Sequence, residues 1–364
     1  MEGEMNNLIK VWLSVTVSLS YCYVMSKLVS KGTKRLIFFL PIICLFLFLP
    51  LKLNSVNLVG GTSFCISWLA NFKLLLLAFN KGPLASNPSS LSFGRFIVIA
   101  SFPIEIQESN INPSSKNSHF PTKTHQNKQN PSHKNPKRII NFTIKSLLLA
   151  ILIRVCNNQD HNIHPNAVLI LYFFLTYLVL ETILATVATL ARALVGLELE
   201  PQFNEPYLST SLQDFWGRRW NLIVTRILRP TVFEPTFRFS STLLGYKWAA
   251  LPAIIATFVV SGLFHELMYY YMARMPPTWE VTSFFILHGL CLTVEIVLKK
   301  ALSGRWRLPG LVSGALTIGF VMLTSFWLYY PQLLRCKADV RTLEEYANLG
   351  KLLGKMVTVK VTIF

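Results

Sequence analysis

The sequence has few charged residues. Charged side chains make up 14% of the 364 residues, hydrophobic ones make up 52%, and the mean hydropathy is +0.44. About a quarter of the residues are charged in an ordinary water-soluble domain. The composition therefore excludes a soluble domain and predicts an all-α polytopic membrane protein.

Several catalytic and metal-binding patterns are also missing. The chain has no GxSxG turn of a serine hydrolase, no HExxH zinc site and no HxxxxD pattern of soluble acyltransferases. Its six cysteines are scattered without a CxxC pair, so we expect free thiols. The stretch "GKLLGKM" at 350–356 is one residue too short for a phosphate loop and has Met356 where Ser or Thr should stand. These absences argue against a hydrolase, a metal centre and a nucleotide-binding loop.

Seven apolar runs are long enough to cross or nearly cross a bilayer, which takes about 20 helical residues. They cover residues 8–25, 36–53, 56–79, 168–195, 248–272, 284–298 and 309–330. A weaker run at 144–156 ends in Arg154. The first run has no cleavage pattern after it and should remain as an anchor. We therefore expect about eight transmembrane helices.

The net charge of +18 comes from basic residues placed between the apolar runs. The positive-inside rule puts such connections in the cytosol, so no nucleic-acid partner is expected. The basic connections are 27–35, 116–145, 218–247 and 299–307. Alternation then places both termini in the lumen, where the basic tail after Arg335 fits poorly, so one span is miscounted, re-entrant or interfacial.

One connection, 108–138, is rich in Asn, Ser, Pro and Lys with a single aromatic residue. Such a segment cannot bury enough apolar surface to fold, which predicts a disordered cytosolic insertion. Its histidines, His119, His125 and His133, are irregularly spaced and have no acidic or cysteine partner. A solvated linker is therefore favoured over a metal site.

A second connection, 196–247, concentrates aromatic, basic and amide residues in "DFWGRRWN", residues 214–221. Trp216 and Trp220 combine an apolar body with a polar N–H, and Arg218 and Arg219 carry forked donors suited to phosphate. An amphipathic helix on anionic lipid headgroups would use the same residues. Substrate contact and lipid contact both stay open for this cytosolic connection.

Asn221 enters the apolar stretch "LIVTRIL". An amide there is costly unless it is hydrogen-bonded. Either a functional amide or one that positions the following helix would explain it.

His265 and Glu266 lie inside the apolar run 248–272. Ionisable residues at membrane depth are rare and mark function by default, whereas a neutral histidine that only joins helices is the alternative. Glu266 lies about 100° around the helix from His265, which argues against a His–Glu pair on one helix. Gly262 should let a neighbouring helix approach closely.

The next apolar run carries a second histidine, His288. Glu295 follows seven positions later on about the same helical face and is placed to pair with it. A neutral imidazole is a competent general base near neutral pH, which suits removal of a proton from an alcohol.

The segment "PYLSTSLQDFWGRRWN", followed by "SGLFHELMYYY", resembles the membrane-bound O-acyltransferase family and its plant wax synthase branch. The resemblance runs over most of the chain, to "RCKADVRTLEEYA", but not over 108–138. It implies a single domain, 1–364, whose helix bundle encloses a substrate tunnel in the endoplasmic reticulum membrane. The implied reaction transfers a fatty acyl group from acyl-CoA to a long-chain fatty alcohol, forming a wax ester.

The resemblance also implies site residues. His265 would be the essential catalytic residue, and Asn221 would be the asparagine that closes the aromatic-basic motif. The family pattern gives His288 no equally firm role, so His288, Glu295 and Glu266 are supporting candidates from the residues themselves. Acyl-CoA, the co-substrate, would contact Trp216, Arg218, Arg219 and Trp220, with no cofactor and no metal. Transfer would be direct because no activated Ser or Cys nucleophile is evident.

Two alternatives remain at this stage. The acceptor could be a sterol or diacylglycerol, because the chemistry requires only a hydroxyl at membrane depth. A proton-coupled transporter would also place His and Glu in helices, but it would show repeat symmetry and broken helices in matching halves. The sequence shows neither feature.

Overall fold

The computed structural model describes residues 2–85, 91–103, 136–157, 165–195, 202–302, 308–342, 344–346 and 348. Helices dominate these residues, and no strand occurs among them. The chain forms two compact units, one of residues 1–105 with 201–364 and one of residues 106–200. The first unit contains the whole "DFWGRRWN" segment and both membrane histidines.

The N-terminal part of the first unit is a set of long helices joined by tight turns. Its elements are α1 (Glu2–Leu28), α2 (Thr33–Phe48), the 3₁₀ turn η1 (Leu49–Lys52), α3 (Val56–Ser63), the π-helical turn η2 (Phe64–Ala70), α4 (Asn71–Ala78) and α5 (Phe93–Ser101). The elements α3, η2 and α4 follow one another without a break and form one span.

The C-terminal part of this unit begins with short elements and continues into long helices. The short elements are η3 (Pro206–Leu208), α8 (Leu212–Asp214), the π-helical turn η4 (Phe215–Arg219), α9 (Leu222–Leu228), the π-helical turn η5 (Arg229–Phe233) and α10 (Glu234–Leu244). The later elements are α11 (Ala250–Ala273), α12 (Glu280–Ala301), α13 (Gly310–Thr324), the π-helical turn η6 (Ser325–Tyr329) and α14 (Tyr330–Arg335).

The seven predicted apolar runs are all helical and long enough to cross a membrane. The candidate spans are Gly3–Leu28, Thr33–Lys52, Val56–Ala78, Ala167–Val187, Ala250–Ala273, Glu280–Ala301 and Gly310–Arg335. The eighth, weaker run lies in α6 (Pro136–Asn157), which is not among the candidate spans of the described residues. The expected all-α polytopic membrane protein is confirmed.

The second unit is a pair of helices, α6 and α7 (Pro165–Val195), packed against each other. Lys145 Nζ lies 2.7 Å from Glu181 Oε1, and this ion pair joins the two helices where α7 carries a carboxylate inside an apolar span. The predicted insertion 108–138 lies outside the described residues except for 136–138, which begin α6.

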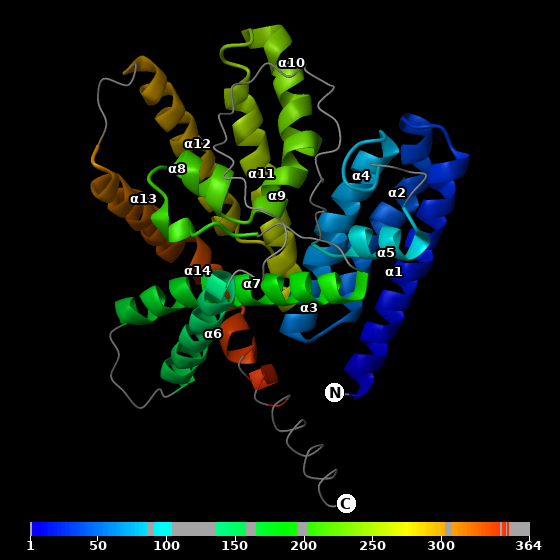
Figure 1. Ribbon diagram of the computed structural model, residues 1–364, viewed down its shortest axis with the longest axis horizontal. Coiled ribbons are helices and arrows are strands. Elements are labelled where there is room, and N and C mark those ends of the chain that lie inside the picture. The colour runs from blue at the N-terminus through cyan, green and yellow to red at the C-terminus, as the bar shows by residue number, and fades with distance from the viewer. Residues whose placement is uncertain are drawn as a thin grey trace, which may run out of the picture. The chain divides into compact units, whose positions relative to one another are not determined.

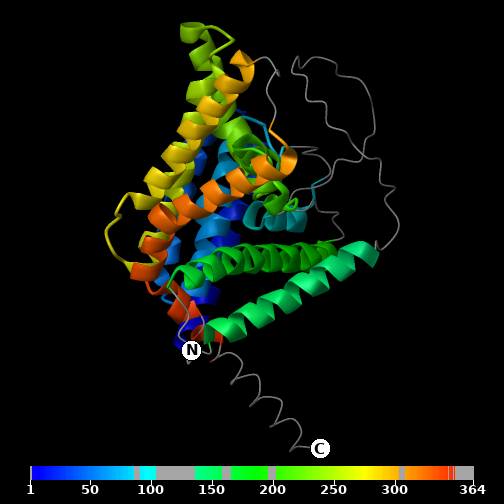
Figure 2. The ribbon, with the colours of Figure 1, turned by 90° about the vertical axis from the view of Figure 1, so that its left-hand side faces the viewer.

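Within the first unit, α1, α2 and α4 lie side by side, and α11 packs along α12 (Figure 1; Figure 2). A Cβ atom added to Gly262 on α11 would lie 2.9 Å from Thr282 Cα on α12. The expected close approach at Gly262 is thus confirmed. Helix α11 also contacts α3, so the C-terminal part of the unit packs against the N-terminal part through these two helices.

One end of this unit brings together Glu4 near the N-terminus, the start of α3 and Glu345 near the end of the described chain. Glu4 accepts hydrogen bonds from the N–H groups of Asn54 and Ser55, and Glu345 accepts one from the Ser55 hydroxyl at 2.7 Å. The α1–α2 connection, α10 and the end of α12 lie at the opposite end (Figure 1). Six spans therefore return the chain to the end where it began.

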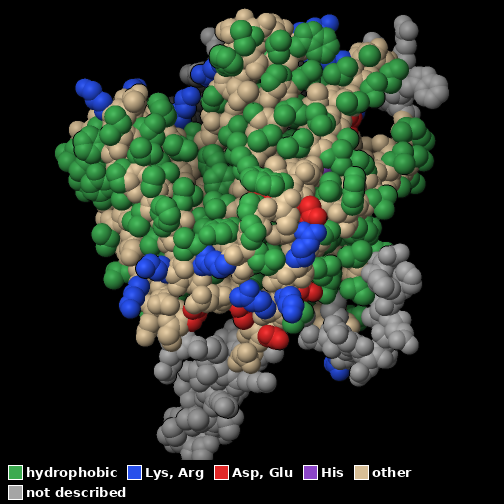
Figure 3. Space-filling view, turned by 180° about the vertical axis from the view of Figure 1, so that it is seen from behind, with side chains coloured by type: hydrophobic (Ala, Val, Ile, Leu, Met, Phe, Trp, Pro, Cys, Tyr) green, Lys and Arg blue, Asp and Glu red, His purple; other side chains and the backbone are tan. Residues whose placement is uncertain are grey.

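The spans differ strongly in burial. In Val56–Ala78, 78% of the most apolar window is buried, against 28% in Gly3–Leu28. Apolar side chains cover most of the face seen in Figure 3, and Leu13, Val17 and Trp327 are 62–70% exposed. Such an apolar surface suits contact with lipid. The high burial of Val56–Ala78 identifies this span as the central one.

Candidate active site

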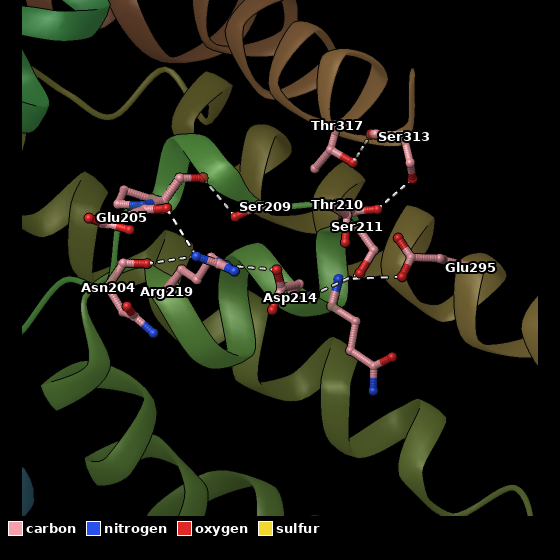
Figure 4. A network of polar contacts seen from close by, with 12 residues as sticks. Asn204, Glu205, Ser209, Thr210, Ser211, Asp214, Arg219, Glu295, Ser313 and Thr317 are labelled. Carbon is pink, nitrogen blue, oxygen red and sulfur yellow. Dashed lines mark hydrogen bonds and ion pairs between the residues drawn. The ribbon is translucent and has the colours of Figure 1, made fainter. Parts of the chain in front are cut away.

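The "DFWGRRWN" segment is held in shape by its own hydrogen bonds (Figure 4). The Asn204 N–H donates to Arg219 O at 2.9 Å, and the Leu222 N–H donates to Gln202 O at 2.8 Å. Within the segment, Arg219 Nε donates a hydrogen bond to Asp214 Oδ2 at 2.7 Å. These contacts hold the short turn η4 against residues 202–205.

The same segment is tied to α12 and α13. Glu295 Oε2 accepts the Leu212 N–H at 2.8 Å, and Ser313 Oγ donates to Thr210 O at 2.6 Å. The predicted pairing of Glu295 with His288 is therefore wrong. Seven residues rise about 10 Å along a helix, so Glu295 lies level with α8, where it accepts hydrogen bonds at the start of the motif.

Aromatic rings of η4 pack inward against the bundle. Phe215 stacks on Trp220 with ring centroids 5.4 Å apart, and Trp216 meets Phe258 and Phe285 at 5.5 and 5.9 Å. Phe215 is 3% exposed. The aromatic side chains of the motif therefore pack the connection against helices α11 and α12.

His288 is fully buried and hydrogen-bonded at both ring nitrogens. Trp216 Nε1–H donates to its Nδ1 at 3.1 Å, so Nδ1 carries no proton. Its Nε2 lies 2.8 Å from Thr324 Oγ1, whose own hydroxyl donates to Phe320 O at 2.7 Å. Nε2 must therefore be the donor, and His288 is a neutral ring that joins η4, α12 and α13.

His265 is satisfied at only one nitrogen. Its Nδ1 lies 2.7 Å from Ser261 O, and because a carbonyl only accepts, Nδ1 carries the proton. Nε2 makes no hydrogen bond to any residue that the structure describes. The remaining lone pair makes His265 the membrane histidine that is free to accept a proton.

The imidazole of His265 is surrounded by aromatic rings from three other elements. Phe285 of α12 lies 4.5 Å away between ring centroids, Trp68 of η2 5.2 Å and Tyr329 of η6 6.0 Å. Two of these rings stand on π-helical turns, which are rare and are frequent at functional sites. The arrangement surrounds a free base with apolar faces.

Glu266 points away from this ring. Its Oε1 accepts the Thr282 N–H at 3.2 Å, and the residue is 4% exposed. This matches the expectation that Glu266 does not form a pair with His265. The contact lies at the close approach of α11 and α12.

Asn221 precedes α9 in the left-handed region, with φ of 40°, a conformation that asparagine tolerates better than most residues. Its side chain does not cap the helix, because Gln202 Oε1 accepts the Ile223 N–H at 3.2 Å. Asn221 Oδ1 is buried and has no hydrogen-bond partner in the described ranges. The amide oxygen is thus unused by the fold.

Helix α9 brings Asn221 toward the same core as His265. Ile223, Ile227 and Leu228 pack in one cluster with Trp68, and Phe264 packs against that cluster. Trp68 in turn contacts His265. Asn221 thus stands two positions before the first α9 residue of this cluster, and His265 contacts the cluster through Trp68.

The two motif arginines lie in different environments. Arg219 is held by Asp214 and by the carbonyls of Asn204 and Glu205. Arg218 is exposed and makes no hydrogen bond or ion pair within the described part of the chain. Of the pair, Arg218 is the one with donors free for a phosphate group.

Sequence reasoning missed Trp68 and Tyr329. Trp68 shares a helical face with Phe64 and Phe72, and the run 56–79 shows that spacing. A tryptophan in a buried helix normally needs a partner for its N–H, which was the available signal. Tyr329 stands near the end of its run and showed no such signal.

A cavity of 430 Å³ lies elsewhere in the first unit, between α1, α2, α4 and α5. Its lining includes Tyr23, Lys27 and Arg35 and none of the residues around His265. The predicted substrate tunnel at His265 therefore stays a prediction.

The chain matches known proteins over nearly its full length. Residues 199–287 match the model of the membrane bound O-acyl transferase family, a stretch that includes Asn221 and His265. The chain is 46% identical to Acyl-CoA–sterol O-acyltransferase 1 of Arabidopsis thaliana, covering 95% of this chain and 96% of that protein.

Two further relatives carry another name. The Long-chain-alcohol O-fatty-acyltransferase of Simmondsia chinensis is 43% identical, covering 95% of both chains. The Probable long-chain-alcohol O-fatty-acyltransferase 2 of Arabidopsis thaliana is 45% identical with the same coverage. Identity at this level over almost the whole length leaves one conclusion: the chain belongs to the membrane-bound O-acyltransferase family.

Proposed function

We propose that this protein transfers a fatty acyl group from acyl-CoA to the hydroxyl of a long-chain fatty alcohol, giving a wax ester and free CoA. The observation that carries the proposal is the free Nε2 of His265 at membrane depth. Relatives at 43% and 45% identity are named for acyl transfer to long-chain alcohols. The reaction would take place in the endoplasmic reticulum membrane.

His265 would act as the general base. Its Nδ1–H is held by Ser261 O at 2.7 Å, so the ring orientation and the tautomer are fixed before substrate binds. Nε2 would take the alcohol proton as the alcohol oxygen attacks the thioester carbonyl. A positioned base of this kind contributes about 10²- to 10⁴-fold to the rate.

Asn221 would contact the reactants. Its Oδ1 is buried and unused by the fold, and a buried acceptor left without a partner is costly unless a ligand supplies one. The single hydroxyl proton of the alcohol is directed at His265 Nε2, so the donor for Asn221 would come from acyl-CoA, whose pantetheine arm carries amide N–H groups. The Asn221 amide would then orient the acyl donor beside the base.

Arg218 would bind the phosphate groups of CoA at the end of the bundle that we expect to face the cytosol. Its guanidinium is exposed and free, while Arg219 is occupied in holding the motif. This assigns the two arginines different roles. Contact of Arg218 with anionic lipid headgroups remains the competing role.

A sterol acceptor is the second candidate. The relative at 46% identity is named for acyl transfer to sterol, and the catalytic requirement is the same for any hydroxyl at membrane depth. The two acceptors differ in shape: a fatty alcohol is a flexible chain, whereas a sterol is a rigid fused ring system.

The deciding experiment is expression in a yeast strain without its own neutral-lipid acyltransferases, supplied with fatty alcohol or sterol. We expect wax esters, and we expect none from the His265→Gln variant at equal expression. Steryl esters alone would establish the sterol reaction instead. If neither ester forms from purified, folded protein with acyl-CoA, the proposed function is wrong.

A further inference from the structure

Trp68 occupies the centre of the most buried span. It stands in the π-helical turn η2 and is 2% exposed. With Phe64, Phe72 and Leu75 it forms one face of the helix, which packs against α9 and against Phe264 of α11. The indole is therefore enclosed by protein on the side of the site.

Two residues close to Trp68 on the span 56–78 are anchored by polar contacts. Ser67 Oγ donates to Phe46 O at 2.7 Å, and Asn71 Nδ2 donates to Ile43 O at 3.2 Å. Both acceptors belong to α2. Because the residues on either side of Trp68 along the helix are fixed to α2, the position of the indole is set by the fold.

The indole N–H of Trp68 has no use in that fold. Nε1 is buried and makes no hydrogen bond to any described residue, although buried tryptophans normally pair this group. Trp216 shows the ordinary situation, with its N–H donated to His288 Nδ1 at 3.1 Å. The unpaired donor of Trp68 lies on the ring that meets His265 edge-on, with ring centroids 5.2 Å apart.

A ring with a free donor and a ring with a free base are thus in contact. Acyl transfer needs both kinds of group close to the reacting carbon. The base takes the alcohol proton, and the donor stabilises the negative charge that develops on the carbonyl oxygen. Asn221, whose Oδ1 is also unpaired, stands two positions before Ile223, a member of the cluster that holds Trp68. No other residue in contact with the His265 ring carries an unpaired N–H among the described residues.

We propose that the Trp68 indole N–H is the hydrogen-bond donor to the thioester carbonyl oxygen in the transition state of acyl transfer. The proposal rests on the acyltransferase function proposed above and deepens it. Trp68 is then a catalytic residue, because it contacts the reacting oxygen.

The acyl transfer begins with attack of the alcohol on the thioester and ends with departure of CoA. The alcohol O–H gives its proton to His265 Nε2 while its oxygen bonds to the acyl carbon, and the carbonyl oxygen becomes an oxyanion bound by Trp68 N–H. The carbon–sulfur bond then breaks, the carbonyl re-forms, and the imidazolium returns the proton to the CoA sulfur. The products are the ester and CoA thiol, and Trp68 keeps its proton throughout.

The test replaces the N–H and keeps the ring. Trp68→Phe, measured in purified protein with acyl-CoA and alcohol, should lower kcat about 10²- to 10³-fold, as loss of one oxyanion donor does elsewhere, with KM for both substrates little changed. Site-specific incorporation of the benzothienyl analogue of tryptophan, which has sulfur in place of N–H, should give the same loss in an isosteric ring.

The matched control is Phe72→Leu, which disturbs the same packing cluster without removing a donor. It should leave kcat near that of the wild type. If the benzothienyl variant is as active as the wild type, or if Phe72→Leu and Trp68→Phe lose activity equally, the proposal is overturned.

Failure of the proposed function would look different. In that case the wild-type protein itself would form no ester from acyl-CoA and alcohol. The Trp68 variants are informative when the wild type turns over, and thermal unfolding of each variant shows whether a loss of rate reflects a loss of fold.

Discussion

The two membrane histidines lie on neighbouring helices, and the structure treats them in opposite ways. His288 is fully buried and uses both ring nitrogens, one toward Trp216 and one toward Thr324. His265 uses one nitrogen within its own helix and keeps the other free. The same side chain is thus a joint between three elements in one helix and an available base in the next.

The difference arises from segments distant in sequence. The partners of His288 come from η4 and from α13, whereas His265 is faced by aromatic carbons of Trp68, Phe285 and Tyr329. An apolar helix does not by itself decide the role of an ionisable residue. The neighbours decide it, by supplying or withholding hydrogen-bond partners.

The largest expected effect is on kcat, and it distinguishes His265 from His288. His265→Gln keeps a hydrogen-bonding side chain but removes the base, so kcat should fall by about 10²- to 10⁴-fold, while insertion and thermal stability stay near those of the wild type. Steady-state kinetics on purified protein measure it. Turnover close to the wild-type value would show that His265 only joins helices.

For His288 we expect the opposite result: substitution should lower stability and have no separate effect on kcat. His288→Ala leaves the buried Trp216 N–H without an acceptor, which costs about 1–3 kcal/mol of stability, and thermal unfolding should report it. Activity should fall in step with the amount of folded protein.

The matched change is His288→Asn, whose amide can both accept and donate. Compared with His288→Ala, His288→Asn should recover part of the thermal stability and most of the wild-type turnover. If His288→Asn instead abolishes turnover in fully folded protein, the contrast between the two histidines is broken.

The two arginines offer a smaller version of the same comparison. Arg218→Ala should raise the KM for acyl-CoA about fivefold, as loss of one exposed charge contact would, with less effect at high salt. Arg219→Ala should lower thermal stability instead, because it breaks contacts to Asp214 and to two backbone carbonyls. An unchanged KM with weakened membrane association would favour the lipid-headgroup role of Arg218.

The smallest effect concerns Glu345, outside the membrane spans. Burial raises the pKa of its carboxyl, but hydrogen bonds from Ser55, Asn57 and Val56 outweigh burial and hold the pKa below its usual value. A lowered folded-state pKa stabilises the protein above the unfolded-state pKa, and that stabilisation is lost as pH falls through the folded-state value.

Thermal unfolding across acidic pH measures this contribution. Glu345→Gln should lower the free energy of unfolding by about 1 kcal/mol, as loss of a helix cap does. It should also make stability less dependent on pH at and below the ordinary pKa of a glutamate. Activity at neutral pH should barely change. A large loss of turnover would mean that this end of the bundle affects the site around the histidines.

Much of the fold followed from composition and periodicity. Runs of about 20 apolar residues must hydrogen-bond their backbone internally in lipid, so they become helices, and the seven strong runs did. The run at 144–156 was ambiguous because its flanks carry charge. It is helical, as part of α6, and it is not among the candidate spans of the described residues.

The prominence of His265, Asn221 and "DFWGRRWN" was also visible in the sequence, because ionisable and amide groups are costly in apolar surroundings. The sequence alone determined that these groups had to be explained. It could not determine their partners, since hydrogen bonds between segments 72 residues apart, as for Trp216 and His288, depend on how helices pack.

Tertiary structure therefore decided the roles. It paired Glu295 with the backbone of α8, although helical spacing had suggested His288, and it occupied Arg219 while leaving Arg218 free. It also placed Trp68, with its unused N–H, beside His265. Sequence fixes which polar groups must enter the membrane, but only packing fixes which of them remain unpaired, because pairing is a property of neighbours in space.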